Sequence, residues 1–415
     1  MENKNKELLH HCMRADKKQP TDKRQHVNSS LTVGLLGSGQ LGQMMAMAAK
    51  TMGHQVLVYD VRSGGPAASV ADEIIVAAFE EEKALRDFAS RVDLITLEFE
   101  NIPSASLELL ASLTSLNPSP KVVRICQDRV LEKEFLQKGG FPVAPFRVIT
   151  SVEELLGAVA ALKSNAILKT AMLGYDGKGQ VSIVANASTE EVQQAWAALR
   201  SERAVLEQKI EFQAEGSLIV ARSTSGEMAS FPPQENHHVQ GILDVSRAPA
   251  RFSSNVLREM EVLGRAIAEA IEVIGLLTVE FFVLPNDEII VNELAPRPHN
   301  SGHHTIESST TSQFEQAVRA VTGASLGSTE LVKPAIMLNL LGDLWHDGEP
   351  DWQPFLGRPE IFLHLYGKKD ATPGRKMGHI TFTGEHREKL LQQAKEQLRK
   401  KIHTDGSERK GIHAT

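Results

Sequence analysis

A strand, a glycine turn and a helix near the start of the chain restrict the possible folds most strongly. Residues 31–36 (LTVGLL) predict a buried strand, and Gly37–Gly42 then forms a G-x-G-x-x-G turn that opens a helix. Further apolar strands are expected at residues 55–60 and 92–97, each reached through a helical segment. Parallel strands joined by helices are buried on both faces, so each reads as a nearly continuous apolar run. The pattern predicts a Rossmann-like α/β domain over residues 31–150.

The glycine turn has two interpretations. Asp60 ends the next strand, where a ribose-binding carboxylate would stand, so turn and aspartate together are typical of an NAD-dependent oxidoreductase. Three glycines also permit a tight turn and close helix–strand packing without any dinucleotide. In either case the turn offers amide donors at a helix N-terminus, which suit a phosphate. The turn alone does not decide between these interpretations.

Composition excludes several other classes. The chain has 415 residues and a formal net charge of −7, which is unlike the basic surface of a nucleic-acid-binding protein. Its only cysteines, Cys12 and Cys126, cannot supply a four-cysteine zinc site, and we expect no disulfide scaffold. No run of 18 or more apolar residues is present, and the first 30 residues are polar and of mixed charge. We therefore expect a cytoplasmic protein with neither a nucleic-acid nor a membrane partner.

The pattern of strands, helices and glycines divides the chain into parts. A chain of this length is long enough for about three domains. After the Rossmann-like domain comes a small α+β unit with a glycine loop, and then a larger α+β region that includes a hairpin. The predicted divisions are a disordered extension (1–30), the N-terminal domain (31–150), a central lid domain (151–212), a C-terminal domain (213–400) and a polar tail (401–415).

The hairpin expected over residues 276–294 brings two carboxylates together. If its turn centres on Asn286 and Asp287, the antiparallel register places Glu280 opposite Glu293 and Phe281 opposite Asn292. Opposed residues on one face have Cβ atoms about 4.5–5.5 Å apart. Two carboxylates at this separation repel each other by roughly 4 kcal/mol at an effective dielectric of 20. A cation between them would remove this repulsion, and oxygen ligands suit Mg²⁺. The alternatives are that both glutamates turn into solvent or that the register differs.

A lysine-ended strand and a glycine loop indicate a phosphate site. Lys169 closes a strand, and the following sequence, TAMLGYDGKGQ, contains three glycines and Lys178. Glycines let backbone N–H groups approach phosphate oxygens, and the lysines supply positive charge. The loop lacks the Walker A pattern, and a solvated glycine hairpin is the simpler alternative. Loop, lysine and carboxylate hairpin together favour Mg·ATP held between two lobes.

Several longer motifs resemble one family of the ATP-grasp superfamily, the N5-carboxyaminoimidazole ribonucleotide synthetases. They are EFENIP (98–103), QDR (127–129), GYDGKGQ (174–180), NELAPRPHNSGHHTIE (292–307), TSQFEQ (311–316), GSTEL (327–331), HLYGK (364–368) and PGRKMGH (373–379). The resemblance covers residues 31–385 in family order. It implies three ATP-grasp domains, with ATP and Mg²⁺ as cofactors, 5-aminoimidazole ribonucleotide and bicarbonate as substrates, and a homodimer.

The resemblance also implies a role for individual residues. Contacts to bicarbonate and carboxyphosphate, or to the transferred phosphoryl group, are implied for Arg297, His299, Asn300 and Lys169. The implied ATP-binding residues are Arg129, Lys169, Gly174, Tyr175, Asp176, Gly177, Lys178, Gly179, Gln180, Glu207, Gln208, Lys209, Ile210, Glu215, His238, Asn292 and Glu293. Among them, residues 207–210 would form the adenine hinge. The implied ribonucleotide-binding residues are Gln40, Leu41, Glu98, Tyr175, Asp176, Lys368 and Arg375, and the implied metal ligands are Glu280 and Glu293.

Some features leave alternatives open. Another ATP-grasp ligase and a non-catalytic nucleotide-binding protein are the competing functions. Ala171, Met172 and Leu173 depart from the family pattern ahead of the glycine loop. The histidines at 299, 303 and 304 do not have the spacing of a known zinc site, so we expect anion contacts or structural hydrogen bonds there.

Overall fold

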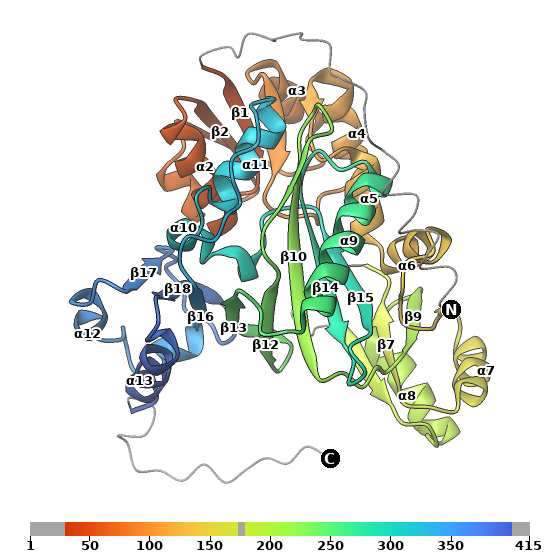
Figure 1. Ribbon diagram of the computed structural model, residues 1–415. Coiled ribbons are helices and arrows are strands. Elements are labelled where there is room, and N and C mark those ends of the chain that lie inside the picture. Colours follow the sequence, from red (N-terminus) through yellow and green to blue (C-terminus); the bar gives the residue numbers. More distant parts are fainter. Residues whose placement is uncertain (1–29, 173–178, 401–415) are drawn as a thin grey trace, which may run out of the picture.

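Three β-sheets organise residues 30–172 and 179–400, the part of the chain that the computed structural model describes (Figure 1). The N-terminal sheet is parallel, with strand order β3-β2-β1-β4-β5. Its strands are β1 (Thr32–Leu36), β2 (Gln55–Asp60), β3 (Glu73–Val76), β4 (Leu94–Leu97) and β5 (Ser115–Leu116). The accompanying helices are α2 (Gln40–Thr51), α3 (Glu82–Ser90), α4 (Ser104–Leu113) and α5 (Pro120–Gln127). The Rossmann-like prediction for this part is confirmed.

Gly37 shows why the first turn requires glycine. Its φ is +102°, and a Cβ built on it would lie 2.6 Å from Cγ of Glu98 and 2.7 Å from the Phe99 ring. An L side chain in left-handed backbone costs roughly 1–2 kcal/mol, and overpacking adds about 1–3 kcal/mol. Both costs apply at this one position.

Replacing Gly37 with alanine should therefore lower the free energy of unfolding by at least about 2 kcal/mol, measured by urea denaturation. Gly64→Ala is the matched control in the same domain, because nothing lies within 4 Å of its built Cβ. Equal stability of the two variants would contradict the packing argument.

A four-stranded sheet with order β6-β9-β7-β8 forms the central unit. Its strands are β6 (Phe146–Ile149), β7 (Ala166–Thr170), β8 (Gln180–Ile183) and β9 (Ala204–Gln208), and its helices are α7 (Val152–Leu162) and α8 (Thr189–Leu199). Apolar residues of both helices pack on the sheet. Strand β6 pairs with β9 but lies ahead of the predicted boundary at residue 151. Pro142 and Pro145 lie just before β6, and prolines are typical of connecting segments.

The largest sheet has nine strands, with order β15-β14-β10-β12-β13-β16-β18-β17 and β11 paired to β10. Its strands are β10 (Ala214–Arg222), β11 (Met228–Ser230), β12 (Gln234–Val239), β13 (Ile242–Ala248), β14 (Gly275–Val283), β15 (Ile289–Ala295), β16 (Ala335–Leu341), β17 (Ile361–Leu365) and β18 (Lys376–Thr383). The helices in this part of the chain are α9 (Ser254–Ile271), α10 (Thr305–Ser308), α11 (Gln313–Thr322), α12 (Gln353–Leu356) and α13 (Arg387–Lys400). Among the described residues, no helix combines the length and apolar character needed to cross a bilayer.

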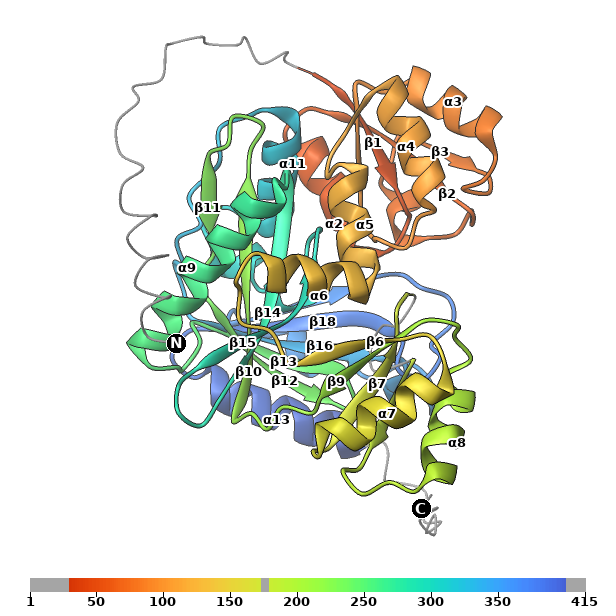
Figure 2. The same ribbon diagram turned by 90° about the vertical axis from the view of Figure 1, so that its right-hand side faces the viewer.

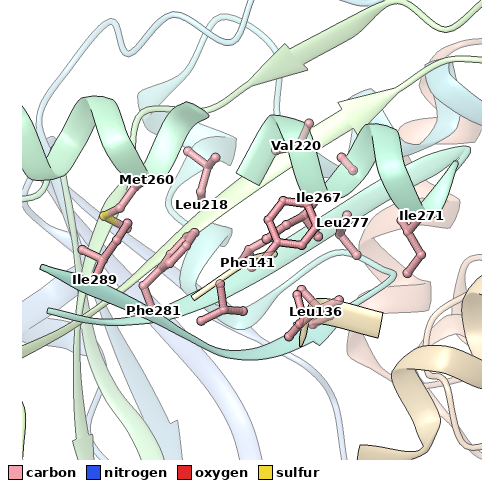
Figure 3. Close-up of a cluster of buried hydrophobic side chains, with 14 of the residues drawn as sticks. Leu136, Phe141, Leu218, Val220, Met260, Ile267, Ile271, Leu277, Phe281 and Ile289 are labelled. Atoms are coloured by element: carbon pink, nitrogen blue, oxygen red, sulfur yellow. The ribbon is translucent and has the colours of Figure 1, made fainter. Parts of the chain in front are cut away.

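A buried apolar cluster fixes helix α6 (Arg129–Lys138) to the nine-stranded sheet. Figure 3 shows Met260 and Ile267 of α9 in one cluster with Leu218 of β10, Phe281 of β14 and Leu136 of α6. Fully burying one such side chain contributes about 1.5–3 kcal/mol. Figure 2 shows α6 between the N-terminal domain and the central sheet. The cluster therefore holds α6 where all three parts of the molecule meet.

The β14–β15 hairpin differs from its predicted register by one residue near the turn. Leu284 N–H donates to Glu288 O at 2.8 Å, and Asp287 has a φ of +65°. The loop therefore has three residues rather than two, and Phe281 pairs with Val291 instead of Asn292. A bulge then restores the predicted register, because Val279 pairs with Leu294.

Candidate active site

A cavity of about 1430 Å³ lies where the three sheets meet. It collects predicted site residues from every part of the chain: Gln40, Leu41, Glu98, Arg129, Lys169, Gln180, Glu215, His238, Glu280, Asn292, Glu293, Arg297, His299, Asn300, Lys368 and Arg375 all line it. These residues span more than 300 positions of the sequence. Most of the predicted site is thus one continuous space.

The hairpin bulge directs the carboxylates into this cavity. Two steps along β14, from Val279 to Phe281, oppose three steps along β15, from Val291 to Leu294. Asn292 and Glu293 therefore both lie opposite Glu280. Glu280 is largely covered, whereas Glu293 is open to the cavity. The opposition of the two glutamates is confirmed, in a bulged form.

Glu280 and Glu293 are suited to share a cation. Limited solvation raises the pKa of Glu293, and the negative charge of Glu280 raises it further. Burial would also raise the pKa of Glu280, but its hydrogen bond and charge interaction with His299 lower it overall. His299 Nε2 lies 2.9 Å from Glu280 Oε1. Two facing carboxylates with an amide oxygen donor beside them form a donor set that fits Mg²⁺.

A second histidine–carboxylate pair lies beside the first. His238 Nδ1 lies 2.8 Å from Glu215 Oε2. Burial would lower the pKa of His238, but the hydrogen bond to Glu215 and the negative charges of Glu280 and Glu293 raise it overall. Glu215 and His238, both predicted near the nucleotide, thus lie together.

The side chain of Lys169 forms an ion pair with Glu207 and is largely shielded from solvent. Lys169 Nζ lies 3.1 Å from Glu207 Oε2, and Lys133 Nζ lies 3.4 Å from the same oxygen. Burial lowers the pKa of Lys169, although the charge of Glu207 opposes this. Glu207 was predicted to belong to the adenine hinge with Gln208, Lys209 and Ile210. Its side chain contacts the two lysines, and the N–H groups of Gln208 and Lys209 donate to Pro145 O and Asn165 O, each at 2.9 Å. The adenine hinge stays a prediction.

Arg297 forms an ion pair with Glu100 within the cavity, with Nη2 donating to Oε1 at 3.1 Å. Burial would lower the pKa of Arg297, but the charge of Glu100 raises it overall. Glu100 responds in the opposite sense: burial would raise its pKa, and Arg297 lowers it. Both side chains remain about one-fifth exposed, so a ligand can still reach them.

The glycine turn donates two of its amides to a carboxylate of the same domain. The Glu98 carboxylate accepts hydrogen bonds from Gly39 N–H and from Gly42 N–H, the latter at 2.7 Å. Asp60 is similarly engaged, because its carboxylate accepts from Ser38 N–H at 2.7 Å. An internal carboxylate therefore occupies two of the amide donors at this turn, and a phosphate there stays a prediction. Asp60, the carboxylate that would bind a ribose, thus already accepts a hydrogen bond from the turn.

The far end of the cavity is cationic. Lys368 Nζ donates to Gln40 Oε1 at 2.8 Å and to Lys376 O at 2.7 Å, which joins the N-terminal and C-terminal parts of the chain. Burial, followed by the positive charge of Arg375, lowers the pKa of Lys368 to about 8. An anion placed here would relieve that repulsion.

Part of the predicted loop lies outside the described residues, namely Gly174, Tyr175, Asp176, Gly177 and Lys178. Gly179 O accepts a hydrogen bond from Thr170 N–H at 2.8 Å, and Gln180 begins β8. His303 and His304 are buried, and no group of three or more His, Cys, Asp or Glu suited to a metal occurs within residues 30–172 and 179–400. The histidine cluster thus has structural contacts, as with His303 and Gln313.

Glu132 and Lys133, two buried residues of α6, were missed from the sequence. Glu100 follows the same strand end as Glu98 in EFENIP and was noted there, but no ligand contact was assigned to it. Glu132 and Lys133 gave no such signal, because charged residues on a helix usually face solvent. Burial raises the pKa of Glu132 to about 8. The positive charge of Lys133 lowers this pKa, and the negative charge of Glu293 raises it.

A lysine on the central sheet, a carboxylate pair on the larger sheet and a cavity between them define the chain as an ATP-grasp enzyme. Family models agree with this class. Residues 134–314 match the ATP-grasp domain, residues 30–127 match the ribonucleotide synthetase preATP-grasp domain, and residues 335–393 match the phosphoribosylaminoimidazole carboxylase C-terminal domain.

More particularly, the chain belongs to the N5-carboxyaminoimidazole ribonucleotide synthase family. The synthase of Brucella melitensis is 43% identical over 84% of this chain and 95% of its own length. An ADP complex of an N5-carboxyaminoimidazole ribonucleotide synthetase has a TM-score of 0.84 at 40% identity, covering 90% of this chain and 97% of its own. The Aspergillus clavatus synthase in complex with ADP and 5-aminoimidazole ribonucleotide has a TM-score of 0.81 at 32% identity, covering 90% and 99%.

Proposed function

We propose that the protein uses ATP to carboxylate the amino group of 5-aminoimidazole ribonucleotide with bicarbonate. The observation that carries the proposal is the single cavity that joins Lys169, the carboxylate hairpin, Arg297 and the cations around Lys368. The complex of the Aspergillus clavatus relative with ADP and the ribonucleotide supports the same assignment.

The proposed chemistry makes bicarbonate reactive. A bicarbonate oxygen attacks the γ-phosphorus of ATP, the bond to the β-phosphate oxygen breaks, and carboxyphosphate and ADP form. The 5-amino nitrogen then takes up the carboxyl carbon, directly or through released CO₂, while inorganic phosphate leaves and the nitrogen loses a proton. The product is N5-carboxyaminoimidazole ribonucleotide, an intermediate of purine biosynthesis.

The residues contribute mainly position and charge. Lys169 and Arg129 would contact the ATP phosphates, and Arg297, His299 and Asn300 would surround bicarbonate. Glu280, Glu293 and Asn292 would hold Mg²⁺, which would neutralise phosphate charge when bound. Lys368 and Arg375 would bind the 5′-phosphate of the ribonucleotide. Glu98 would act indirectly, since its carboxylate shapes the turn that carries Gln40 and Leu41. A homodimer and a cytoplasmic location stay predictions.

ADP release tests the proposal. We expect ADP to form rapidly when ATP, Mg²⁺, bicarbonate and 5-aminoimidazole ribonucleotide are all present, and at least 10-fold more slowly without the ribonucleotide, because binding the second substrate completes the site. Depleting bicarbonate should lower the rate as well. ADP formation that is indifferent to the ribonucleotide would overturn the substrate assignment.

A further inference from the structure

Helix α6 carries two consecutive charged residues that are almost completely buried. Glu132 is 3% exposed and Lys133 is 1% exposed. Burying charged groups is costly unless each has a partner, so two in succession on one helix require specific contacts. Both point toward the same short stretch of β15, which forms one edge of the nine-stranded sheet.

The two side chains bind the backbone on either side of Glu293. Glu132 Oε2 accepts a hydrogen bond from Leu294 N–H at 2.8 Å. Lys133 Nζ donates to Asn292 O at 2.9 Å. These backbone groups belong to the bulge that places Asn292 and Glu293 opposite Glu280. A bulge interrupts the regular ladder, so its geometry depends on whatever else binds the strand.

Lys133 also connects the β14–β15 hairpin to Lys169, the lysine expected to contact the ATP phosphates. Its Nζ lies 3.4 Å from Glu207 Oε2, the oxygen that lies 3.1 Å from Lys169 Nζ. Glu207 belongs to β9 of the central sheet, whereas Asn292 belongs to β15 of the larger sheet. One buried lysine therefore contacts both lobes that enclose the proposed nucleotide site.

We propose that Glu132 and Lys133 are positioning residues that fix the β15 bulge and so orient Asn292 and Glu293 for the divalent cation of the nucleotide. Leu136 anchors α6 independently in the apolar cluster of Figure 3, so the helix keeps its place when either charged side chain is replaced. The proposal rests on the proposed ATP-dependent function for the identity of the bound group. Its test uses binding rather than turnover.

The experiment measures Mn²⁺ binding to the full chain in the presence of ADP, by loss of the free Mn²⁺ signal in electron paramagnetic resonance. Glu132→Leu removes the acceptor for Leu294 N–H, and we expect Mn²⁺ to bind at least about 10-fold more weakly, as is typical when a group that orients a metal ligand is lost. Lys133→Met should weaken binding to a similar extent. Glu132→Gln keeps an oxygen acceptor and should remain within about 3-fold of the unmodified chain, well short of the loss typical of a removed orienting group.

Glu134→Leu on the same helix is the matched control, because among the described residues the ion pair of Glu134 is with the exposed Lys138. It should bind Mn²⁺ as the unmodified chain does. If Glu132→Leu does not fold, Glu132→Asp decides the question, since it keeps the carboxyl group but withdraws it by one methylene. Unchanged Mn²⁺ affinity in a folded Glu132→Leu or Glu132→Asp variant would overturn the proposal. Mn²⁺ binding could be weakened in these variants while ADP release by the unmodified chain does not depend on the ribonucleotide. That result would support the positioning role of Glu132 and Lys133 and would contradict the substrate assignment alone.

Discussion

Glu293→Gln is expected to reduce ADP release in the complete reaction by on the order of 100-fold or more, the usual loss when a group that organises developing charge is removed. Glu293 lies opposite Glu280 across the hairpin bulge and opens into the cavity. Glutamine keeps the size of the side chain but removes the negative charge that would attract Mg²⁺. The fold should be retained, and the loss should be only partly recovered at high Mg²⁺ concentration.

Glu288→Gln is the control for this substitution. Glu288 lies in the same hairpin but is exposed beside the turn. Replacing its carboxylate with an amide should therefore leave ADP release unchanged. Activity close to normal in Glu293→Gln at low Mg²⁺ would remove Glu293 from the proposed metal site. An equal loss in both variants would indicate that the hairpin, rather than the carboxylate, had been damaged.

Arg297→Met should lower both activity and stability. Loss of a cation that faces charge developing on carboxyphosphate should reduce kcat by about 100-fold to 1000-fold. Glu100 would be left without its main charge partner. Because each side chain of the pair is about one-fifth exposed and water can enter the cavity, we expect a loss of about 2 kcal/mol in unfolding free energy, below the 3–5 kcal/mol typical of a fully buried pair.

A double variant separates these two effects. Arg297→Met combined with Glu100→Gln leaves neither side chain charged, so much of the stability should return while activity stays low. Arg86→Met removes an exposed ion pair with Glu82 and should cost no more than about 0.5 kcal/mol. If the double variant regained activity, Arg297 would act by neutralising Glu100 and not through substrate.

The carboxylate hairpin shows how far sequence reasoning reached and where it stopped. Apolar flanks and a turn sequence were enough to predict that Glu280 opposes Glu293. The register near the turn was wrong by one residue, because Asp287 adopts left-handed backbone and lengthens the loop. The bulge that compensates for this depends on contacts from α6, which lies more than 150 residues earlier in the chain. Local pattern alone does not contain that information.

Other misses have the same origin. Glu132 and Lys133 carry charge on an amphipathic helix, and their burial follows only from the packing of α6 against two sheets. Glu207 shows the same limit, because the resemblance gave no indication that Lys169 and Lys133 contact its carboxylate. Most of the predicted site residues in the described part of the chain line the cavity. Their pairings with one another required the tertiary structure.

The Glu98 carboxylate at the glycine turn has a consequence for how such hexapeptides are interpreted. In this chain the G-x-G-x-x-G sequence is accompanied by an internal acceptor, because Glu98 at the end of β4 accepts hydrogen bonds from two amides of the turn. A search for dinucleotide enzymes by this hexapeptide alone would therefore select the chain in error. Inspecting the residue after the fourth strand would correct the assignment, and any redesign of the turn as a cofactor site would have to begin by removing that acid.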